Sequence, residues 1–136
     1  MIDTHNHFAW GAADAMFRLD LVYPAVESIR EIADLVEYAT LEKDAGDWIV
    51  GNGWDQGKLA EERNMRASDL DGVSPDNPVW LGHASGHYGV ANSAALALAN
   101  VTRDTRDPVG GFIERDENGE PEQDGERFLH CLCPVW

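Results

Sequence analysis

The sequence predicts an α/β fold, because short apolar segments with strand character alternate along the chain with segments of helical periodicity. The chain has 136 residues, of which 43% are hydrophobic. This is enough apolar material for one packed domain or for part of a larger one. The patterns run in the order strand, helix, strand, helix, strand and hairpin.

The first predicted strand covers residues 1–9. Alternate residues of a strand share a face, so Asp3, His5 and His7 are expected to lie together on one side. A polar face on an opening strand is unusual unless that face looks into a functional site.

A helix is predicted over residues 28–43. Ser28 followed by Glu31 matches a capping box, which starts a helix. Gly46 breaks the pattern shortly after its end. Apolar residues recur through the segment at helical spacing, namely Ile29, Ile32, Val36 and Ala39.

Two further apolar segments, residues 48–50 and 79–81, predict short buried strands. The first ends at a glycine-rich turn over residues 51–53. The second runs directly into a histidine-containing loop. Between the two strands, residues 68–72 suit a single turn of helix.

The last elements are a helix, a strand and a hairpin. Asn92 can cap a helix over residues 93–99. A third strand candidate covers residues 110–115, and Asn118-Gly119 is a hairpin turn signal. Residues 123–136 match no clear element.

Composition narrows the classes of partner. The chain has 25 acidic and 10 basic residues and a formal charge of −15, which argues against nucleic acid because phosphate binding relies on Lys and Arg. We interpret the acidic excess as a solvated surface. No apolar run approaches the roughly 18 residues of a membrane span. No secretory signal opens the chain, so a cytoplasmic location is expected.

His5 and His7 are the strongest candidates for metal ligands. On one strand face, their Cα atoms are about 6–7 Å apart, which lets both imidazoles reach one cation at about 2.0–2.1 Å. Imidazole suits zinc, iron and nickel, and Asp3 can orient a ring. The alternative is a strand with two incidental surface histidines, since short motifs give false positives. The preceding aspartate, in a chain with only 5 histidines, favours a site.

A second group of candidates follows the strand at residues 79–81, in the kind of loop where α/β sites are built. His87 can transfer a proton or donate to a substrate oxygen, and a structural role fits the pattern equally well. His83 fits a hydrogen-bonded core histidine better, but a place in the substrate site stays open.

A third candidate is the pair Trp54 and Asp55, which follows a glycine-rich stretch. An aromatic ring and a carboxylate in such a place can line a substrate pocket. A core tryptophan beside a turn-forming aspartate explains the same residues equally well.

Together these segments resemble the amidohydrolase superfamily, in its family 3 branch, often called YtcJ-like. The resemblance covers roughly residues 2–121. The first motif alone is shared by many metal-dependent hydrolases, and the combination is more specific. The segments that carry the resemblance are Ile2-Asp3-Thr4-His5-Asn6-His7-Phe8, Gly51-Asn52-Gly53-Trp54-Asp55, Ser85-Gly86-His87, Val90-Ala91-Asn92-Ser93-Ala94-Ala95-Leu96 and Gly110-Gly111-Phe112-Ile113 with its continuation to Pro121.

The resemblance implies a partial (β/α)8 barrel, in which the first strand carries the metal pair His5 and His7 and an inserted α/β segment covers the site. A divalent metal ion, expected to be zinc, would activate a water that attacks the C–N bond of an amide-like small molecule. His87 matches a position near the pocket and is assigned a catalytic role. Trp54, Asp55 and His83 are assigned to substrate binding.

The chain also departs from the family pattern. The family runs to several hundred residues, and later metal ligands and a catalytic aspartate are missing. Two histidines do not complete a catalytic zinc site, which normally takes three protein ligands. We therefore divide the chain into an amidohydrolase-like N-terminal fragment, residues 1–121, and an atypical tail, residues 122–136. On its own the chain is expected to be inactive.

Two alternatives remain at this stage. Another metal-dependent barrel hydrolase, acting on phosphoesters, also suits the opening Asp-x-His-x-His motif. A non-catalytic α/β binding module is the other, and its exposed strand edges would need cover, for which a homo-oligomer is one solution.

Overall fold

The computed structural model describes a central sheet and the helices around it. The described residues are 17–109, 111, 113–115, 118–119 and 121. The predicted first strand, with His5 and His7, and the predicted tail over residues 122–136 lie outside the described residues.

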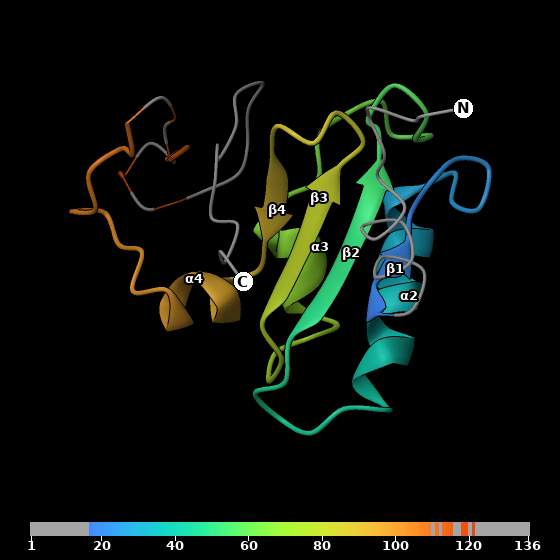
Figure 1. The fold of residues 1–136 in the computed structure, drawn as a ribbon, viewed down its shortest axis with the longest axis horizontal. Coiled ribbons are helices and arrows are strands. Elements are labelled where there is room, and N and C mark those ends of the chain that lie inside the picture. The colour runs from blue at the N-terminus through green and yellow to red at the C-terminus, as the bar shows by residue number, and fades with distance from the viewer. Residues whose placement is uncertain (1–16, 110, 112, 116–117, 120, 122–136) are drawn as a thin grey trace, which may run out of the picture.

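Four strands form one sheet in the order β1-β2-β3-β4 (Figure 1). The first three strands are parallel, and the fourth is antiparallel to the third. The bounds are β1 Leu19–Asp20, β2 Ile49–Trp54, β3 Val79–His83 and β4 Gly89–Ala91. The α/β class predicted from the sequence is therefore confirmed.

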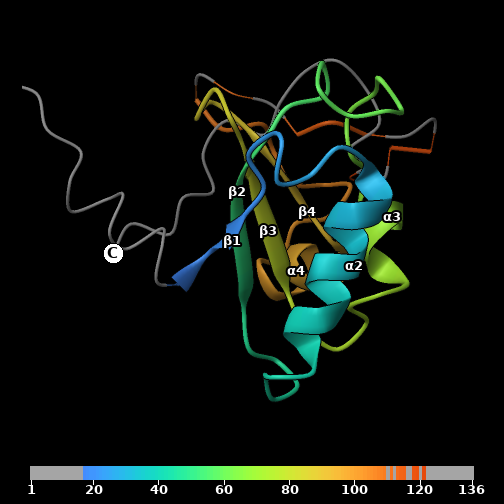
Figure 2. The same ribbon diagram turned by 90° about the vertical axis from the view of Figure 1, so that its right-hand side faces the viewer.

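Two helices cover one face of the sheet. Figure 2 shows α2 (Ile29–Thr40) and α3 (Ala67–Asp71) on the same side, each connecting two parallel strands. A third helix, α4 (Ser93–Leu98), follows β4. Among the residues described, no helix has the length and apolar character needed to cross a membrane.

The start of α2 keeps half of the predicted capping box, because the reciprocal bond goes to the amide one residue before the cap. Ser28 Oγ accepts a hydrogen bond from the Glu31 amide at 3.2 Å, and the Glu31 carboxylate accepts one from the amide of Glu27 at 2.7 Å. The helix ends earlier than the predicted residue 43. The Leu41 and Glu42 amides bond to carbonyls three residues back, which tightens the last turn and ends the α-helix.

The glycine-rich segment after residue 50 is strand, not the turn that the sequence predicts. Gly51 pairs with Leu81, and a Cβ at Gly51 would lie 2.9 Å from a Leu81 methyl carbon. Gly53 has a φ of +108° and lies in a bulge between Asn52 and Trp54. These glycines thus permit close packing and a bulge, and the strand continues to Trp54.

Two short strands escape sequence analysis. β1 has two residues and β4 has three, too few to show a periodic pattern. The short helix expected over residues 68–72 is observed one residue earlier, as α3, and the helix expected over residues 93–99 is observed as α4.

The main core lies between the sheet and the helices on its covered face. A smaller cluster of Ala91, Ala95 and Leu96 packs with Trp80 and Val101. The main core consists of the buried side chains of Leu21, Val26, Ile29, Ile32, Val36, Ile49, Trp54, Leu59, Met65, Leu70, Val79, Leu81 and Val90.

Asn92 joins three parts of this fold. It is fully buried, and its Oδ1 accepts from the amides of Val79 and Ala95, both at 2.9 Å. Its Nδ2 donates to the carbonyl oxygens of Ser74 and Asn77 at 3.0 and 2.9 Å. The predicted helix cap is confirmed, and the same side chain also ties the start of β3 to the loop after α3.

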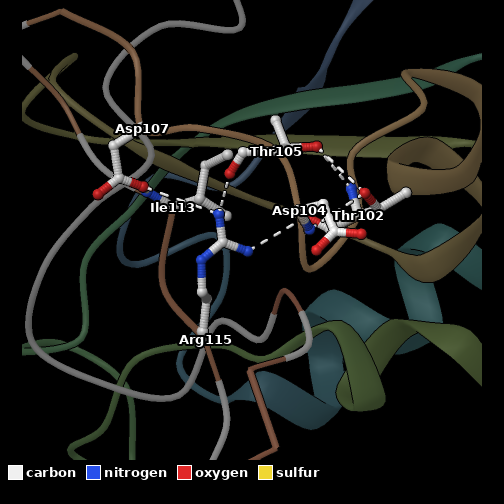
Figure 3. A network of polar contacts seen from close by, with 6 residues as sticks. All are labelled: Thr102, Asp104, Thr105, Asp107, Ile113 and Arg115. Carbon is white, nitrogen blue, oxygen red and sulfur yellow. Dashed lines mark hydrogen bonds and ion pairs between the residues drawn. The ribbon is translucent and has the colours of Figure 1, made fainter.

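Beyond α4, Arg115 connects the described residues through its guanidinium group (Figure 3). Its guanidinium donates to the carbonyl oxygens of Thr102 and Thr105 and lies 3.8 Å from an Asp107 carboxylate oxygen. Arg115 also forms an isolated antiparallel bridge with Pro121, which agrees with the predicted hairpin signal. The third strand candidate at residues 110–115 is only partly described.

Candidate functional site at the carboxyl ends of β2 and β3

The described candidate residues gather where β2 and β3 end. Because these strands are parallel neighbours, their carboxyl ends meet at one edge of the sheet, which is the usual place for sites in α/β folds. Trp54 and His83 are register partners at that edge. The Ala84 amide donates to the Trp54 carbonyl oxygen at 2.9 Å and joins the two loops that follow.

Trp54 is part of the core. Its side chain is 1% exposed, and its indole Nε1 donates to the Leu81 carbonyl oxygen at 3.0 Å. The bulge at Gly53 turns Trp54 toward the covered face, where it packs among the core residues. A direct contact between Trp54 and substrate therefore stays a prediction. What the geometry shows is that Trp54 packs in the core, next to the edge where the candidate residues lie.

Asp55 forms the turn after β2. Its Oδ1 accepts from the Gly57 amide at 2.8 Å, and its backbone carbonyl accepts from the Lys58 amide at 2.9 Å. Asp55 as a whole is half-buried. This is the turn-forming role that sequence analysis left open, and substrate binding by the same carboxylate stays a prediction.

His83 ends β3 and is 8% exposed. The Ser85 amide can only donate, and it lies 3.0 Å from His83 Nδ1, so Nδ1 carries no proton. Nε2 then carries the ring proton and donates to Gln56 Oε1 at 2.8 Å. Burial lowers the pKa of His83 below 6.5, and the negative charge of Asp55 opposes that shift.

Gln56 and Tyr88 complete the arrangement around His83. The His83 and Tyr88 rings are stacked with centroids 3.9 Å apart, and the Tyr88 hydroxyl donates to Gln56 Oε1 at 3.0 Å. Burial raises the pKa of Tyr88. Sequence analysis missed both residues, because neither belongs to a motif and only the sheet brings them together.

His87 lies on the turn between β3 and β4, and its side chain is exposed. Its amide donates to Ser85 Oγ at 3.3 Å, and Gly86 beside it has a φ of +72°. Of the described histidines, His87 is therefore the one whose side chain is accessible to a small molecule. Its catalytic role stays a prediction.

The candidate metal ligands cannot be placed relative to this edge, since His5 and His7 lie outside the described residues. In the part of the chain that is described, no three His, Cys, Asp or Glu side chains are grouped so as to hold a metal ion. The donor set of two imidazoles two residues apart fits a borderline-soft cation such as zinc by its chemistry.

Comparison with known proteins identifies the family of this chain. A model of the amidohydrolase family matches residues 1–128. The chain belongs to the amidohydrolase family. An N-substituted formamide deformylase of Arthrobacter pascens is 38% identical over 120 residues, which are 88% of this chain and 22% of that protein. A Bacillus subtilis (strain 168) protein that carries the name YtcJ is 35% identical, with the same coverage of both chains.

A solved structure agrees with the family assignment. An uncharacterized metal-dependent hydrolase from Pyrococcus furiosus is 28% identical, with a TM-score of 0.54 over 82% of this chain and 19% of its own. This amidohydrolase-family chain thus spans about a fifth of the length of the relatives that it matches.

Proposed function

We propose that this chain is the part of a metal-dependent amidohydrolase that contributes His5 and His7 to a divalent metal ion, expected to be zinc. The protein would hydrolyse C–N bonds of small amide-like molecules. The observation that carries the proposal is the family match over residues 1–128, which includes the His-x-His pair. The deformylase name of one relative supports a C–N bond as the target.

A bound metal ion would polarise the substrate carbonyl and make water a nucleophile at neutral pH. The chain's own residues would shape the site. His87, exposed on the turn after β3, would donate to a substrate oxygen or exchange a proton with the leaving nitrogen. Asp55 would border the substrate, and the buried Trp54 and His83 would support that edge from below.

The isolated chain would bind metal without turning over substrate. It supplies two imidazoles to the site, whereas a catalytic zinc site normally takes three protein ligands. We propose a cytoplasmic location and a small-molecule substrate. No nucleic-acid partner is proposed, given the charge of −15.

Zinc affinity tests the ligand assignment. The 136-residue chain would be titrated against a chromogenic zinc chelator, alongside His5→Ala, His7→Ala and the matched control His87→Ala. The two strand substitutions should each weaken zinc binding at least about tenfold, the usual scale for perturbing a metal site, and the control should not. Equal affinity in all four proteins would refute the assignment.

Turnover requires the rest of the family fold. In a chimera, residues 1–121 would replace the matching segment of the Arthrobacter pascens deformylase, and the purified protein would be assayed on N-substituted formamides and on phosphoesters. Formamide turnover that needs both His5 and His7 would support the proposal. A folded chimera that keeps its metal and its formamide turnover without them would refute it. Turnover of phosphoesters alone would favour the phosphoesterase alternative.

A further inference from the structure

The 84–87 turn, defined as residues Ala84–His87, is hydrogen-bonded to the ring of His83. The Ser85 amide and the Ser85 hydroxyl both lie against His83 Nδ1, at 3.0 and 2.9 Å. On its other side the ring donates from Nε2 to Gln56 Oε1. We propose that His83 is a positioning residue that holds the 84–87 turn in shape while it is neutral, and that gain of a proton by its ring releases the turn.

This inference follows from which partner donates and which accepts in the hydrogen bonds around the His83 ring. Nδ1 accepts from a backbone N–H, which has no alternative role as an acceptor. Gln56 Oε1 already accepts from both His83 Nε2 and the Tyr88 hydroxyl. The ring is thus fixed in the Nε2–H tautomer from both ends.

A second ring proton would displace the bond from the Ser85 amide to the ring. It would be added at Nδ1, where it would face the Ser85 amide proton. The Ser85 hydroxyl can rotate to accept the new proton, but the amide cannot, so it loses its partner and the backbone at Ser85 has to move. The bonds from the His83 amide to Tyr88 and from the Gly86 amide to His83 leave the ring out, so the β3–β4 hairpin can persist.

The surroundings favour the neutral ring at neutral pH. His83 is buried between the stacked Tyr88 ring and the nearly perpendicular Trp54 ring, with centroids 3.9 and 4.9 Å away. Among the residues that the structure describes, the titratable groups that face it are Asp55 after β2 and the Tyr88 phenol. Burial lowers the pKa of His83 more than the Asp55 carboxylate raises it.

The consequence for the site concerns His87, and only this step rests on the proposed function. His87 is joined to the same turn through its amide and Ser85 Oγ, at 3.3 Å. Release of the turn would therefore displace the side chain that the proposed function places beside the substrate. The inference makes His83 a pH-dependent control on that side chain.

Nitrogen and amide NMR on the 136-residue chain tests the inference without metal or substrate. At pH 7.5 the His83 ring should show a protonated Nε2 and an unprotonated Nδ1. As pH falls, the Ser85 amide shift should follow the His83 ring titration. Its hydrogen-exchange protection should fall about two- to tenfold, as loss of one hydrogen bond implies. A His87→Gln variant should show the same transition.

Two substitutions of His83 test the Nδ1 acceptor and the stacked ring independently. His83→Phe keeps the stacked ring but no acceptor, so Ser85 should lose protection at every pH. His83→Asn places an amide oxygen near the position of Nδ1, so protection should persist without the transition. Folding of each variant would be checked by circular dichroism.

Three outcomes would overturn the inference. One is a His83 ring that carries its proton on Nδ1 at neutral pH. Another is a Ser85 amide that keeps its shift and protection while His83 titrates. The third is a folded His83→Phe chain with a fully protected turn. If the zinc titrations failed while these NMR results held, the proposed function would be wrong and the pH-dependent turn would stand.

Discussion

Trp54 and His83 meet edge to face, with ring centroids 4.9 Å apart and planes at 84°. They come from neighbouring parallel strands and are paired across an irregular step in the register. In a regular strand Trp54 would point to the opposite face, since side chains alternate. The bulge at Gly53 therefore brings the tryptophan under the candidate site.

We predict that Gly53→Ala destabilises the chain by about 1–3 kcal/mol, the usual cost of a non-glycine residue in an unfavoured backbone region. Gly53 has a φ of +108°, and an added Cβ would lie 2.5 Å from a Val22 methyl carbon. Urea unfolding would measure the change. The control is Gly72→Ala, where nothing lies within 4 Å of an added Cβ. Equal midpoints for the two variants would contradict the role given to the bulge.

Asn92→Ala should lower the free energy of unfolding by at least about 1–3 kcal/mol, the cost of leaving buried polar groups unpaired. The substitution leaves the amides of Val79 and Ala95 without their acceptor. Ser93→Ala removes one exposed hydroxyl that donates to Asp71, so its effect should stay below about 1 kcal/mol. Denaturant unfolding of both proteins gives the comparison, and a smaller loss for Asn92→Ala than for Ser93→Ala would refute it.

Stability should fall as the pH drops below 6.5, in part because of His83. Burial lowers the pKa of His83 in the folded chain, so the unfolded chain binds the proton first as pH falls. The stabilisation is complete above pH 6.5 and is lost down to the lowered folded pKa. Urea midpoints at pH 7.5 and 5.5 would show this loss, and it should shrink in His83→Phe but not in His87→Gln. An undiminished loss in His83→Phe would assign the pH dependence to other groups.

Asp69→Asn should cost about 1.5–3 kcal/mol, as expected for hydrogen bonds to a charged group. Both carboxylate oxygens of Asp69 accept from Arg63 at 2.8 Å, and Oδ2 also accepts from the Arg66 amide. Asp34 pairs with Arg30 on the exposed surface, so Asp34→Asn should cost less than about 1 kcal/mol. Thermal unfolding of the two variants at pH 7 compares the two pairs.

The Asp69 pair also predicts behaviour in acid. Burial alone would raise the pKa of Asp69, but the hydrogen bonds from Arg63 and the Arg66 amide outweigh it and lower the pKa below 3.8. This stabilisation is present above pH 3.8 and is lost as pH falls through the lowered value. Asp69→Asn should therefore lose less stability than the wild type between pH 4 and pH 2. A parallel loss in both proteins would contradict the assignment.

Features set by neighbours in the chain could be predicted. Ser28 and Glu31 lie three residues apart and start α2 as expected, and Asn92 caps α4 through the nearby Ala95 amide. The assignment of Gly51 to a turn was wrong, because the reason for a glycine there is a leucine on the neighbouring strand.

By itself the sequence determined the α/β class, the caps of α2 and α4 and the family to which the chain belongs, since these depend on local patterns and on motif order. The tertiary structure alone decided that Gln56 and Tyr88 share His83, and on which nitrogen that ring carries its proton. The physical reason is that Gln56 lies 27 residues from His83 in the chain. Hydrogen-bond polarity at such a distance is fixed only when strand pairing brings the groups together.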